Sequence, residues 1–262
     1  GFRLTELKPN EDGLINIDQL EEACEKDTFL MSVMAANNEI GVLQPISEIG
    51  SFCQSKGIAF HTDAAQAFGY VDLDPDKYLI DLMSLSAHKI YGPKGIGALV
   101  IREGLPLEPS QYGGGQELGL RSGTLPVPLI VGFAKAVEIT KNDKDERNKR
   151  LLFFRNLLLS GLKKNITGLI VNGSIDQRLP HNLNITFPGV NGGQLHGQLR
   201  RFIFCTSGSA CSNGEASHVL KEIGLSKSDA EASIRMSIGR DTTEKDIKEA
   251  IKIITNTVIN LR

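Results

Sequence analysis

Short apolar runs of strand length alternate with segments of helical periodicity in the N-terminal part of the chain, and this alternation limits the possible folds strongly. Residues 29–36 (FLMSVMAA) form a continuous apolar run, and residues 58–61 form another after a segment in which Ile46, Ile49 and Phe52 recur at helical spacing. Continuous apolar strands are typical of parallel sheets that are covered on both faces. The pattern predicts an α/β domain with a mainly parallel sheet.

Polar residues follow three of the predicted strands, in the clusters Asn37–Glu39, Asp63–Gln66 and Ser86–Lys89. In open α/β sheets, ligands bind beyond the carboxyl ends of the strands. We therefore expect the three clusters to converge on one site.

The stretch from Ser84 to Gly97 (SLSAHKIYGPKGIG) joins two apolar runs through a turn rich in Gly and Pro. Lys89 lies in this turn beside the hydroxyl of Ser86 and the imidazole of His88. A lysine amine near an apolar scaffold can have its pKa lowered, as Schiff-base chemistry requires. The alternative is that Lys89 is a solvated lysine of an ordinary turn.

Residues 111–128 (QYGGGQELGLRSGTLPVP) form a glycine-dense loop that contains Arg121, Ser122 and Thr124. Such a backbone can approach a phosphate closely, but a plain linker has the same composition.

The four cysteines are scattered, without a CxxC pair, so neither a zinc site nor a disulfide framework is expected. Cys211 lies among small polar residues (TSGSACSNG), which favours an accessible nucleophilic thiol, whereas Cys24, Cys53 and Cys205 fit packing positions. A formal charge of -2 and the lack of an apolar run of about 18 residues give no case for nucleic acid or membrane partners. A cytoplasmic, reducing compartment fits best.

The second half of the chain predicts a smaller α+β domain. We expect a helix from Pro126 to Lys141, a polar break (NDKDERNK) and a second, amphipathic helix, with the domain boundary between residues 143 and 144. The three histidines in this half, His181, His196 and His218, have no partners at metal-ligand spacing and are expected to be surface or packing residues. The other expected strands are 2–7, 169–171, 182–187, 201–205 and 233–238. Further helices are expected after Asp18, which would cap the first of them, and at 194–199, 218–223 and 242–261.

Six strings occur in order along the chain: NNEIGVLQPI, HTDAAQAFG, DLMSLSAHKIYGPKGIGAL, GGGQELGLRSGT, SGSACS and SIRMSIGR. In order and approximate spacing they resemble the cysteine desulfurases, pyridoxal-phosphate enzymes of the class V aminotransferase group, through essentially the whole chain. The short loop around Cys211 resembles that of the housekeeping and nitrogen-fixation branch. The resemblance implies the aspartate-aminotransferase-like fold (fold type I) for residues 1–143, and a small domain carrying the Cys loop for residues 144–262.

The resemblance also implies a role for each matching residue. Lys89 would hold pyridoxal phosphate covalently and act as general base, and Cys211 would receive the sulfur of L-cysteine as a persulfide. Arg235 would bind the substrate carboxylate. Asn38 would contact the ring oxygen or the substrate carboxylate, Asp63 the ring nitrogen and Gln66 the ring hydroxyl. Ser86 and His88 would bind the phosphate, and Thr124 would reach the phosphate of the cofactor in a partner subunit.

The implied function is a homodimeric cysteine desulfurase that converts L-cysteine to L-alanine and passes sulfur to scaffold proteins for iron–sulfur clusters or to thiolation enzymes. The family has a segment before the position of Gly1, including a histidine that stacks on the ring, so we expect this chain to be the C-terminal part of a longer protein. The alternatives are a selenocysteine lyase and a catalytically incomplete fragment that only dimerises or binds partners.

Overall fold

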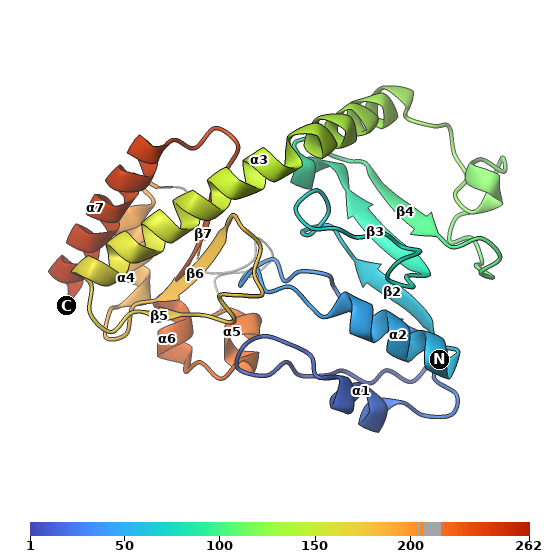
Figure 1. The fold of residues 1–262 in the computed structure, drawn as a ribbon, viewed down its shortest axis with the longest axis horizontal. Helices are drawn as coiled ribbons and strands as arrows, with labels where there is room; N and C mark the ends of the chain where they lie inside the picture. The colour runs from blue at the N-terminus through green and yellow to red at the C-terminus, as the bar shows by residue number, and fades with distance from the viewer. Residues whose placement is uncertain (204, 207–215) are drawn as a thin grey trace. The chain divides into compact units, whose positions relative to one another are not determined.

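The computed structural model describes residues 1–203, 205, 206 and 216–262 (Figure 1). They group into two compact units, and each is described by itself. The first unit comprises Gly1–Lys26, Ala35–Pro45 and Lys144–Arg262, and the second comprises Asp27–Met34 and Ile46–Asp143. That these units correspond to the predicted domains 1–143 and 144–262 stays a prediction.

The second unit is built on a four-stranded sheet in the order β1-β2-β3-β4. Its strands are β1 (Leu30–Ser32), β2 (Ala59–Asp63), β3 (Leu82–Ser86) and β4 (Gly97–Ile101). β1 and β3 pair with β2 in parallel, and β4 pairs with β3 antiparallel. The predicted mainly parallel sheet is therefore confirmed, with one antiparallel strand at its edge.

Helix α2 (Ile46–Lys56) contacts β2 and covers one face of this sheet. Phe60 and Thr62 on β2 are completely buried, as is Ile49 of α2. Because side chains alternate along a strand, His61 and Asp63 belong to the opposite face, and both are at least partly exposed. His61 and Asp63 thus lie on the face that α2 leaves open.

β1 is shorter than the sequence pattern predicts. The apolar run 29–36 contributes only three residues to the sheet, and their burial alternates between exposed and half-buried. Ala35 and Ala36 are buried, but they belong to the first unit. The prediction of a strand covered on both faces was therefore wrong for this segment, because the chain changes units within it.

Helix α3 (Val127–Asn165) runs without interruption for 39 residues, so the predicted break at NDKDERNK was wrong (Figure 1). That segment contains no Gly or Pro, and Lys, Arg and Glu are good helix formers. Pro128 stands in the first turn, where its missing N–H is not needed. Leu151 and Leu162 are buried, so the helix keeps its apolar side beyond the charged segment.

The first unit contains a three-stranded antiparallel sheet in the order β5-β6-β7. Its strands are β5 (Ile170–Val171), β6 (Asn182–Thr186) and β7 (Ser233–Ser237), and its helices are α1 (Ile17–Ala23), α4 (Gly192–Leu199), α5 (His218–Glu222), α6 (Lys227–Glu231) and α7 (Glu244–Leu261). All five residues of β6 are buried. These elements confirm the predicted small α+β part, to which the structure adds α6.

Three local expectations for the first unit were wrong. Residues 2–7 form no strand in the part of the chain that the structure describes, and Phe2 and Leu4 remain exposed. The described residues of 201–205 also form no strand and include a turn. The cap of α1 is Asn16 rather than Asp18, since Asn16 accepts a hydrogen bond from the Asp18 backbone and forms a capping box with Gln19.

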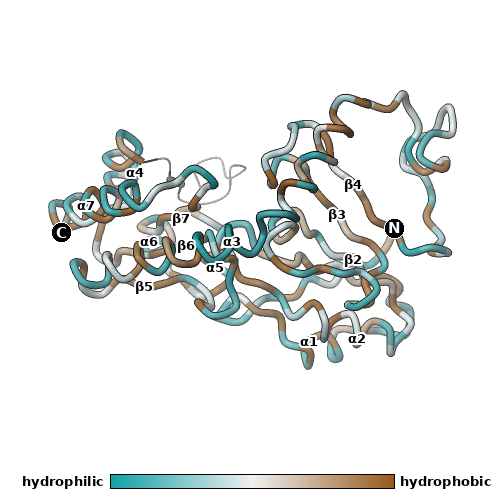
Figure 2. The backbone as a smooth tube through the Cα atoms, turned by 45° about the horizontal axis from the view of Figure 1, so that its top comes forward, coloured by the Kyte–Doolittle hydropathy of each residue, from teal (hydrophilic) through white to brown (hydrophobic). Residues whose placement is uncertain are grey.

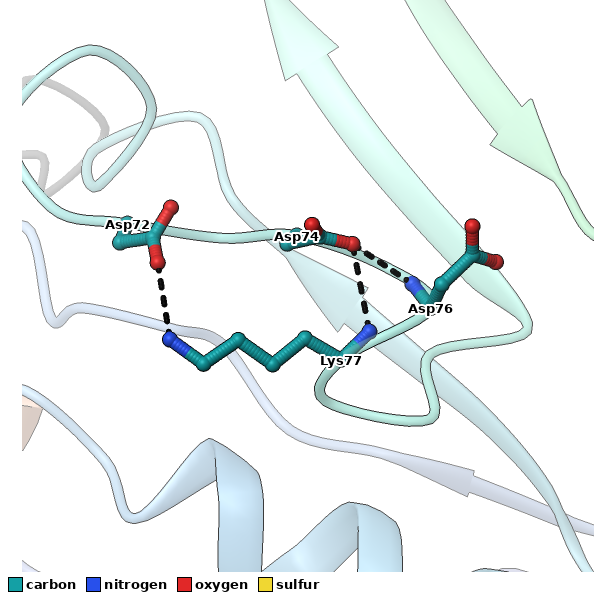
Figure 3. A network of polar contacts seen from close by, with 4 residues as sticks. All are labelled: Asp72, Asp74, Asp76 and Lys77. Carbon is teal, nitrogen blue, oxygen red and sulfur yellow. Dashed lines mark hydrogen bonds and ion pairs between the residues drawn. The ribbon is translucent and has the colours of Figure 1, made fainter.

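A polar turn precedes β3 on the surface of the second unit (Figure 3). Asp74 Oδ1 accepts the backbone N–H groups of Asp76 and Lys77 at 3.0 and 3.2 Å, and the Lys77 ammonium pairs with Asp72 at 3.1 Å. Carboxylates used in this way close a turn rather than form a ligand set. Within the described residues no cluster of His, Cys, Asp and Glu could hold a metal ion.

Candidate functional site

The carboxyl ends of β2 and β3 bring two of the predicted clusters together in the second unit. Asp63 is the last residue of β2 and lies opposite Ser84 on β3, and Ser86 ends β3 two residues later. Partners in neighbouring strands share a face, as do residues two apart along one strand. Asp63, Ser84 and Ser86 therefore lie on the same face of the sheet.

Asp63 ends its strand in an ordered turn. Its Oδ1 accepts the backbone N–H of Ala65 at 2.8 Å, while the N–H of Ala64 continues the ladder to the Ser84 carbonyl at 3.0 Å. Gln66 is half-buried in the turn that follows. The carboxylate of Asp63 is thereby held at the rim of the sheet, where its side chain is exposed.

Lys89 and His88 lie on a short 3₁₀ turn, Ala87–Ile90, directly after β3. The apolar members of this turn, Ala87 and Ile90, are buried against Phe133 and Ala136 of α3. The two polar members are exposed. The first and last residues of the turn thus anchor it against α3, and the two middle residues, His88 and Lys89, face solvent.

Gly92 is required by the close approach of the chain just after this turn. Its backbone N–H donates to the Ala87 carbonyl at 2.9 Å, and a Cβ at this position would lie 2.9 Å from the same oxygen and 3.2 Å from Cβ of Ala136. The glycine in YGPKG therefore lets the chain close tightly over the anchored side of the Lys89 turn.

Ser86 and His88 are joined by a hydrogen bond of 2.9 Å between the serine hydroxyl and Nδ1 of the ring. A hydroxyl and an imidazole at the end of a strand, beside the ammonium of Lys89, form a donor set suited to an anionic group such as a phosphate. Asp63 adds a carboxylate at the end of the neighbouring strand, which suits a protonated ring nitrogen. The described side chains thus fit a ligand that carries both kinds of group.

Thr124 lies in the glycine-dense loop, is exposed, and also belongs to the second unit. The loop is ordered by side chains: Gln116 Oε1 accepts the N–H of Gly123 at 2.9 Å, and Arg121 donates to the Ser122 carbonyl at 2.9 Å. Ser122 is buried. These bonds give the loop a defined shape, which a plain linker does not need.

The third predicted cluster, Asn37–Glu39, lies in the first unit, in a tight turn that brings Ala36 and Leu43 into bridge pairing. Asn37 Oδ1 accepts the N–H groups of Glu39 and Ile40 at 2.8 and 3.0 Å. Gly41 closes the turn with φ +72°, and its N–H donates to the Asn37 carbonyl at 3.0 Å.

The Asn37–Gly41 turn is held against β6 and β7. The Glu39 carbonyl accepts the side-chain amides of Asn182 and Asn184 at 3.3 and 3.2 Å. The carbonyl of Asn38 accepts Nη1 of Arg235, on β7, at 3.2 Å. Asn38 and Arg235, the two predicted substrate contacts, are therefore neighbours.

Arg235 is half-buried, and burial lowers the pKa of its guanidinium, while the negative charge of Glu39 opposes this shift. Glu39 is itself buried and receives a hydrogen bond from the Ser217 hydroxyl. Glu39 was predicted only as a member of its cluster. Its buried state depends on pairing across 178 residues, which no local pattern reveals.

His61 was not predicted as a site residue. Its Nδ1 lies 2.7 Å from Ser32 Oγ and its Nε2 lies 2.9 Å from Ser84 Oγ, so three adjacent strands are linked through one ring. Its position two residues before Asp63 was a signal that it shares the face of that carboxylate.

Cys211 lies outside the described residues, so its predicted role stays a prediction. Cys205, which was predicted to be inert, is half-buried, and burial raises the pKa of its thiol. A raised pKa disfavours the reactive thiolate. Of the remaining histidines, His218 is exposed and His196 lies 3.1 Å from the carbonyl of Ser233 through Nε2.

None of the described helices is both long and apolar enough to cross a membrane.

A family profile and curated relatives both match the sequence of this chain. The aminotransferase class-V family profile matches residues 1–249. The chain is 48% identical, over its whole length, to "Cysteine desulfurase IscS" of Vibrio vulnificus strain YJ016 and 45% identical to "Cysteine desulfurase, mitochondrial" of Arabidopsis thaliana. It spans 65% of the length of the first of these curated relatives and 58% of the second.

Solved structures agree with the sequence relatives. A "NIFS-LIKE PROTEIN" superposes with a TM-score of 0.90 at 35% identity, over 100% of this chain and 69% of the other. A NifS-like protein from Rickettsia africae ESF-5 gives a TM-score of 0.87 at 31% identity, over 95% of this chain and 68% of the other. These matches confirm the predicted fold class. With its family profile matching residues 1–249, the chain belongs to the class-V aminotransferase family.

Proposed function

We propose that this chain carries the lysine, the sulfur acceptor and the carboxylate-binding arginine of a cysteine desulfurase. The observation that carries the proposal is the position of Asp63 opposite Ser84, at the strand end that leads into the Ser86–Lys89 turn, in a chain 48% identical to a cysteine desulfurase over its whole length. Because the chain spans 65% of that relative, the activity and partners of the whole protein are part of the proposal.

The family uses pyridoxal phosphate, and the residues of the second unit fit this group. Asp63 would pair with the ring nitrogen, Ser86 and His88 would bind the phosphate, and Lys89 would bond to the carbonyl carbon. Gln66 would contact the ring hydroxyl, Asn38 the ring hydroxyl or the substrate, and Thr124 the phosphate bound by a partner subunit. When bound, the cofactor supplies a ring that accepts electrons from the substrate α-carbon.

The remaining steps belong to side chains of this chain. The planar guanidinium of Arg235 would bind the carboxylate of L-cysteine with two parallel hydrogen bonds and so orient the α-carbon. Lys89 would take the α-proton as general base. The Cys211 thiolate would attack the substrate sulfur, so that an S–S bond forms and the substrate C–S bond breaks with its electron pair left on the β-carbon. Protonation of the β-carbon and return of a proton to the α-carbon would then give L-alanine, with a persulfide on Cys211.

The partners follow from this chemistry. The persulfide sulfur would pass to acceptor proteins, either scaffolds for iron–sulfur clusters or thiolation enzymes, and the protein would work as a homodimer in the cytoplasm. Scattered cysteines without a disulfide pattern support a reducing compartment. Bacterial relatives named IscS support the same assignment.

The test is borohydride reduction of the purified protein after addition of pyridoxal phosphate, followed by peptide mass mapping. We expect a pyridoxyl label on Lys89 that disappears in Lys89→Gln. Lys94→Gln is the matched control, because Lys94 lies in the same turn region and should leave the label unchanged. A label spread over surface lysines, or none on an intact fold, would contradict the enzyme proposal for this chain and favour a role in dimerisation alone.

The sulfur step has its own test. Incubation with L-cysteine should leave one additional sulfur on Cys211, detected by mass spectrometry after alkylation. Cys211→Ser should abolish it, while Cys205→Ser should retain it, because Cys205 is half-buried with a raised pKa. Persulfide on Cys205 in place of Cys211 would refute the assignment.

A further inference from the structure

His61 is held at both ring nitrogens by serines of the two neighbouring strands. Ser32 Oγ of β1 lies 2.7 Å from Nδ1, and Ser84 Oγ of β3 lies 2.9 Å from Nε2. A serine hydroxyl can donate or accept, so one serine can donate to the bare ring nitrogen while the other accepts from the ring N–H. The three residues form a row across the strands that suits a neutral imidazole.

This row lies on the same face of the sheet as the strand-end residues of the candidate cofactor site, next to them along the strands. His61 and Asp63 are two residues apart on β2 and share a face, and Asp63 lies opposite Ser84 in register. Ser86, the next residue on that face of β3, bonds to His88. The serine that fixes His61 is therefore one step along the strand from the residues that would bind the phosphate.

The charges around His61 favour the neutral ring. Loss of solvation lowers the pKa of His61, and the negative charge of Asp63 opposes this only in part. The flanking residues on β1 and β3, Ser32 and Ser84, are uncharged, and the other titratable ring on this side, His88, is bonded through Ser86. Asp63 is therefore the charged group that interacts with His61.

We propose that His61 is a positioning residue of the pyridoxal-phosphate site: fixed as a neutral ring between Ser32 and Ser84, it leaves the negative charge of Asp63 available for the ring nitrogen of the cofactor. The inference rests on the proposed function. A cation at this position would compete for Asp63, because residues two apart on one face of a strand are only about 7 Å apart, and charges at that separation interact near a protein surface. The row of Ser32, His61 and Ser84 thus keeps the position next to Asp63 uncharged.

The first experiment compares two substitutions in the full chain. His61→Gln keeps a neutral side chain that can donate and accept, and His61→Lys places a permanent positive charge beside Asp63. The dissociation constant of pyridoxal phosphate, followed by absorbance at pH 7.5, should stay within about threefold of wild type in His61→Gln and rise about tenfold or more in His61→Lys. Equal constants for the two variants would overturn the proposal.

The pH dependence separates charge from packing. As pH falls through the pKa of His61, wild-type affinity for pyridoxal phosphate should weaken more than the affinity of His61→Gln, which cannot gain a proton there. Parallel pH profiles for the two proteins would mean that His61 only fills space, and would overturn the proposal.

The second experiment needs no cofactor. Nitrogen-15 NMR of the free chain should show a His61 pKa below 6.5, assigned by loss of its signals in His61→Gln, and Asp63→Asn should lower that pKa further by removing the opposing charge. Ser84→Ala should shift the ring-nitrogen signals, whereas Ser51→Ala, on exposed α2 surface, should not.

The outcomes of the two experiments are distinguishable. If wild type binds no pyridoxal phosphate, the proposed function fails for this chain, and the NMR titration still decides whether His61 and Asp63 are coupled. If wild type binds the cofactor but Asp63→Asn leaves the pKa of His61 unchanged, the proposed function stands and the inference on His61 fails.

Discussion

Nη1 of Arg235 donates a hydrogen bond to the backbone carbonyl of Asn38, at 3.2 Å, across 197 residues of sequence. Arg235 is on β7, and Asn38 is in the tight turn between Asn37 and Gly41. This contact uses one N–H donor of the Arg235 guanidinium and so restrains the plane of the guanidinium fork, the set of parallel N–H groups that can bind a carboxylate. The rest of the fork is therefore oriented before any substrate arrives.

The first prediction concerns this orientation. Arg235→Lys keeps the positive charge but loses the planar fork, so the KM for L-cysteine should rise at least about tenfold, as expected when bidentate binding is lost. Arg3→Lys, in an exposed ion pair with Glu25, is the control and should leave KM unchanged. Steady-state kinetics check the result, and an unaltered KM in Arg235→Lys would remove Arg235 from the substrate site.

The second prediction concerns the turn that carries Asn38. Gly41→Ala should lower the free energy of unfolding by about 2 to 3 kcal/mol, because φ is +72° and the new Cβ would lie 2.4 Å from the Asn182 side chain. Gly57→Ala is a matched control, with φ +69° and nothing within 4 Å, and should cost only about 1 kcal/mol. Urea denaturation of both variants measures the difference, and equal losses would mean that the contact with Asn182 is unimportant.

The third prediction tests the continuity of α3. Lys144→Pro stands in the middle of the 39-residue helix and should destabilise the protein by about 3 kcal/mol or more, since it removes a backbone hydrogen bond and clashes with the preceding turn. Lys144→Ala should change stability by less than about 0.5 kcal/mol. Thermal unfolding followed by circular dichroism compares them, and tolerance of proline would restore the break that the sequence pattern suggested.

The fourth prediction is a dependence of stability on pH. Loss of solvation, with the positive charge of Arg147 second, lowers the pKa of His181 to about 4. The His181 ring of the unfolded chain binds a proton near pH 6.5, whereas the ring of the native protein stays neutral until about pH 4. The free energy of unfolding is therefore highest, with respect to His181, above pH 6.5 and decreases as pH falls toward 4. At pH 5 the loss should be about 2 kcal/mol.

His181→Gln should flatten this part of the stability profile, measured by urea unfolding at pH 7.5 and pH 5. His218→Gln is the control, because His218 is exposed at the start of α5. A wild-type profile that does not change between the two pH values would contradict the shifted pKa of His181.

Local pattern was enough for the features whose determinants are close in sequence. The strand pair around Lys89 and its presentation on a turn were predictable, because two apolar runs flank a Gly- and Pro-rich stretch. Helix α7 was predictable from its periodicity, and Thr243 is the residue that caps it. The rule that ligand sites lie at the carboxyl ends of parallel strands predicted that the clusters Asp63–Gln66 and Ser86–Lys89 come together, and the strand register confirms this for the two.

Features that depend on distant pairing were not predictable. The buried state of Glu39 requires β6 and Ser217, and the ring of His61 requires strands on both sides. Residues 2–7 have the alternation of a strand but find no strand to pair with in the described structure. The charged middle of α3 has the composition of a loop or a helix equally, and tertiary packing of Leu151 and Leu162 decides the outcome.

The antiparallel pairing of β3 with β4 has a consequence for the order in which the site forms. The Lys89 turn lies between two strands that are contiguous in sequence, and Figure 2 shows β4 as a mostly hydrophobic segment. Contacts between residues close in sequence lose little loop-closure entropy and form early in folding. The parallel pairing that brings Asp63 to Ser84 encloses a longer loop and loses more. Lys89 is thus placed by a local hairpin, and we expect the strand pairing that positions Asp63 to form later in folding.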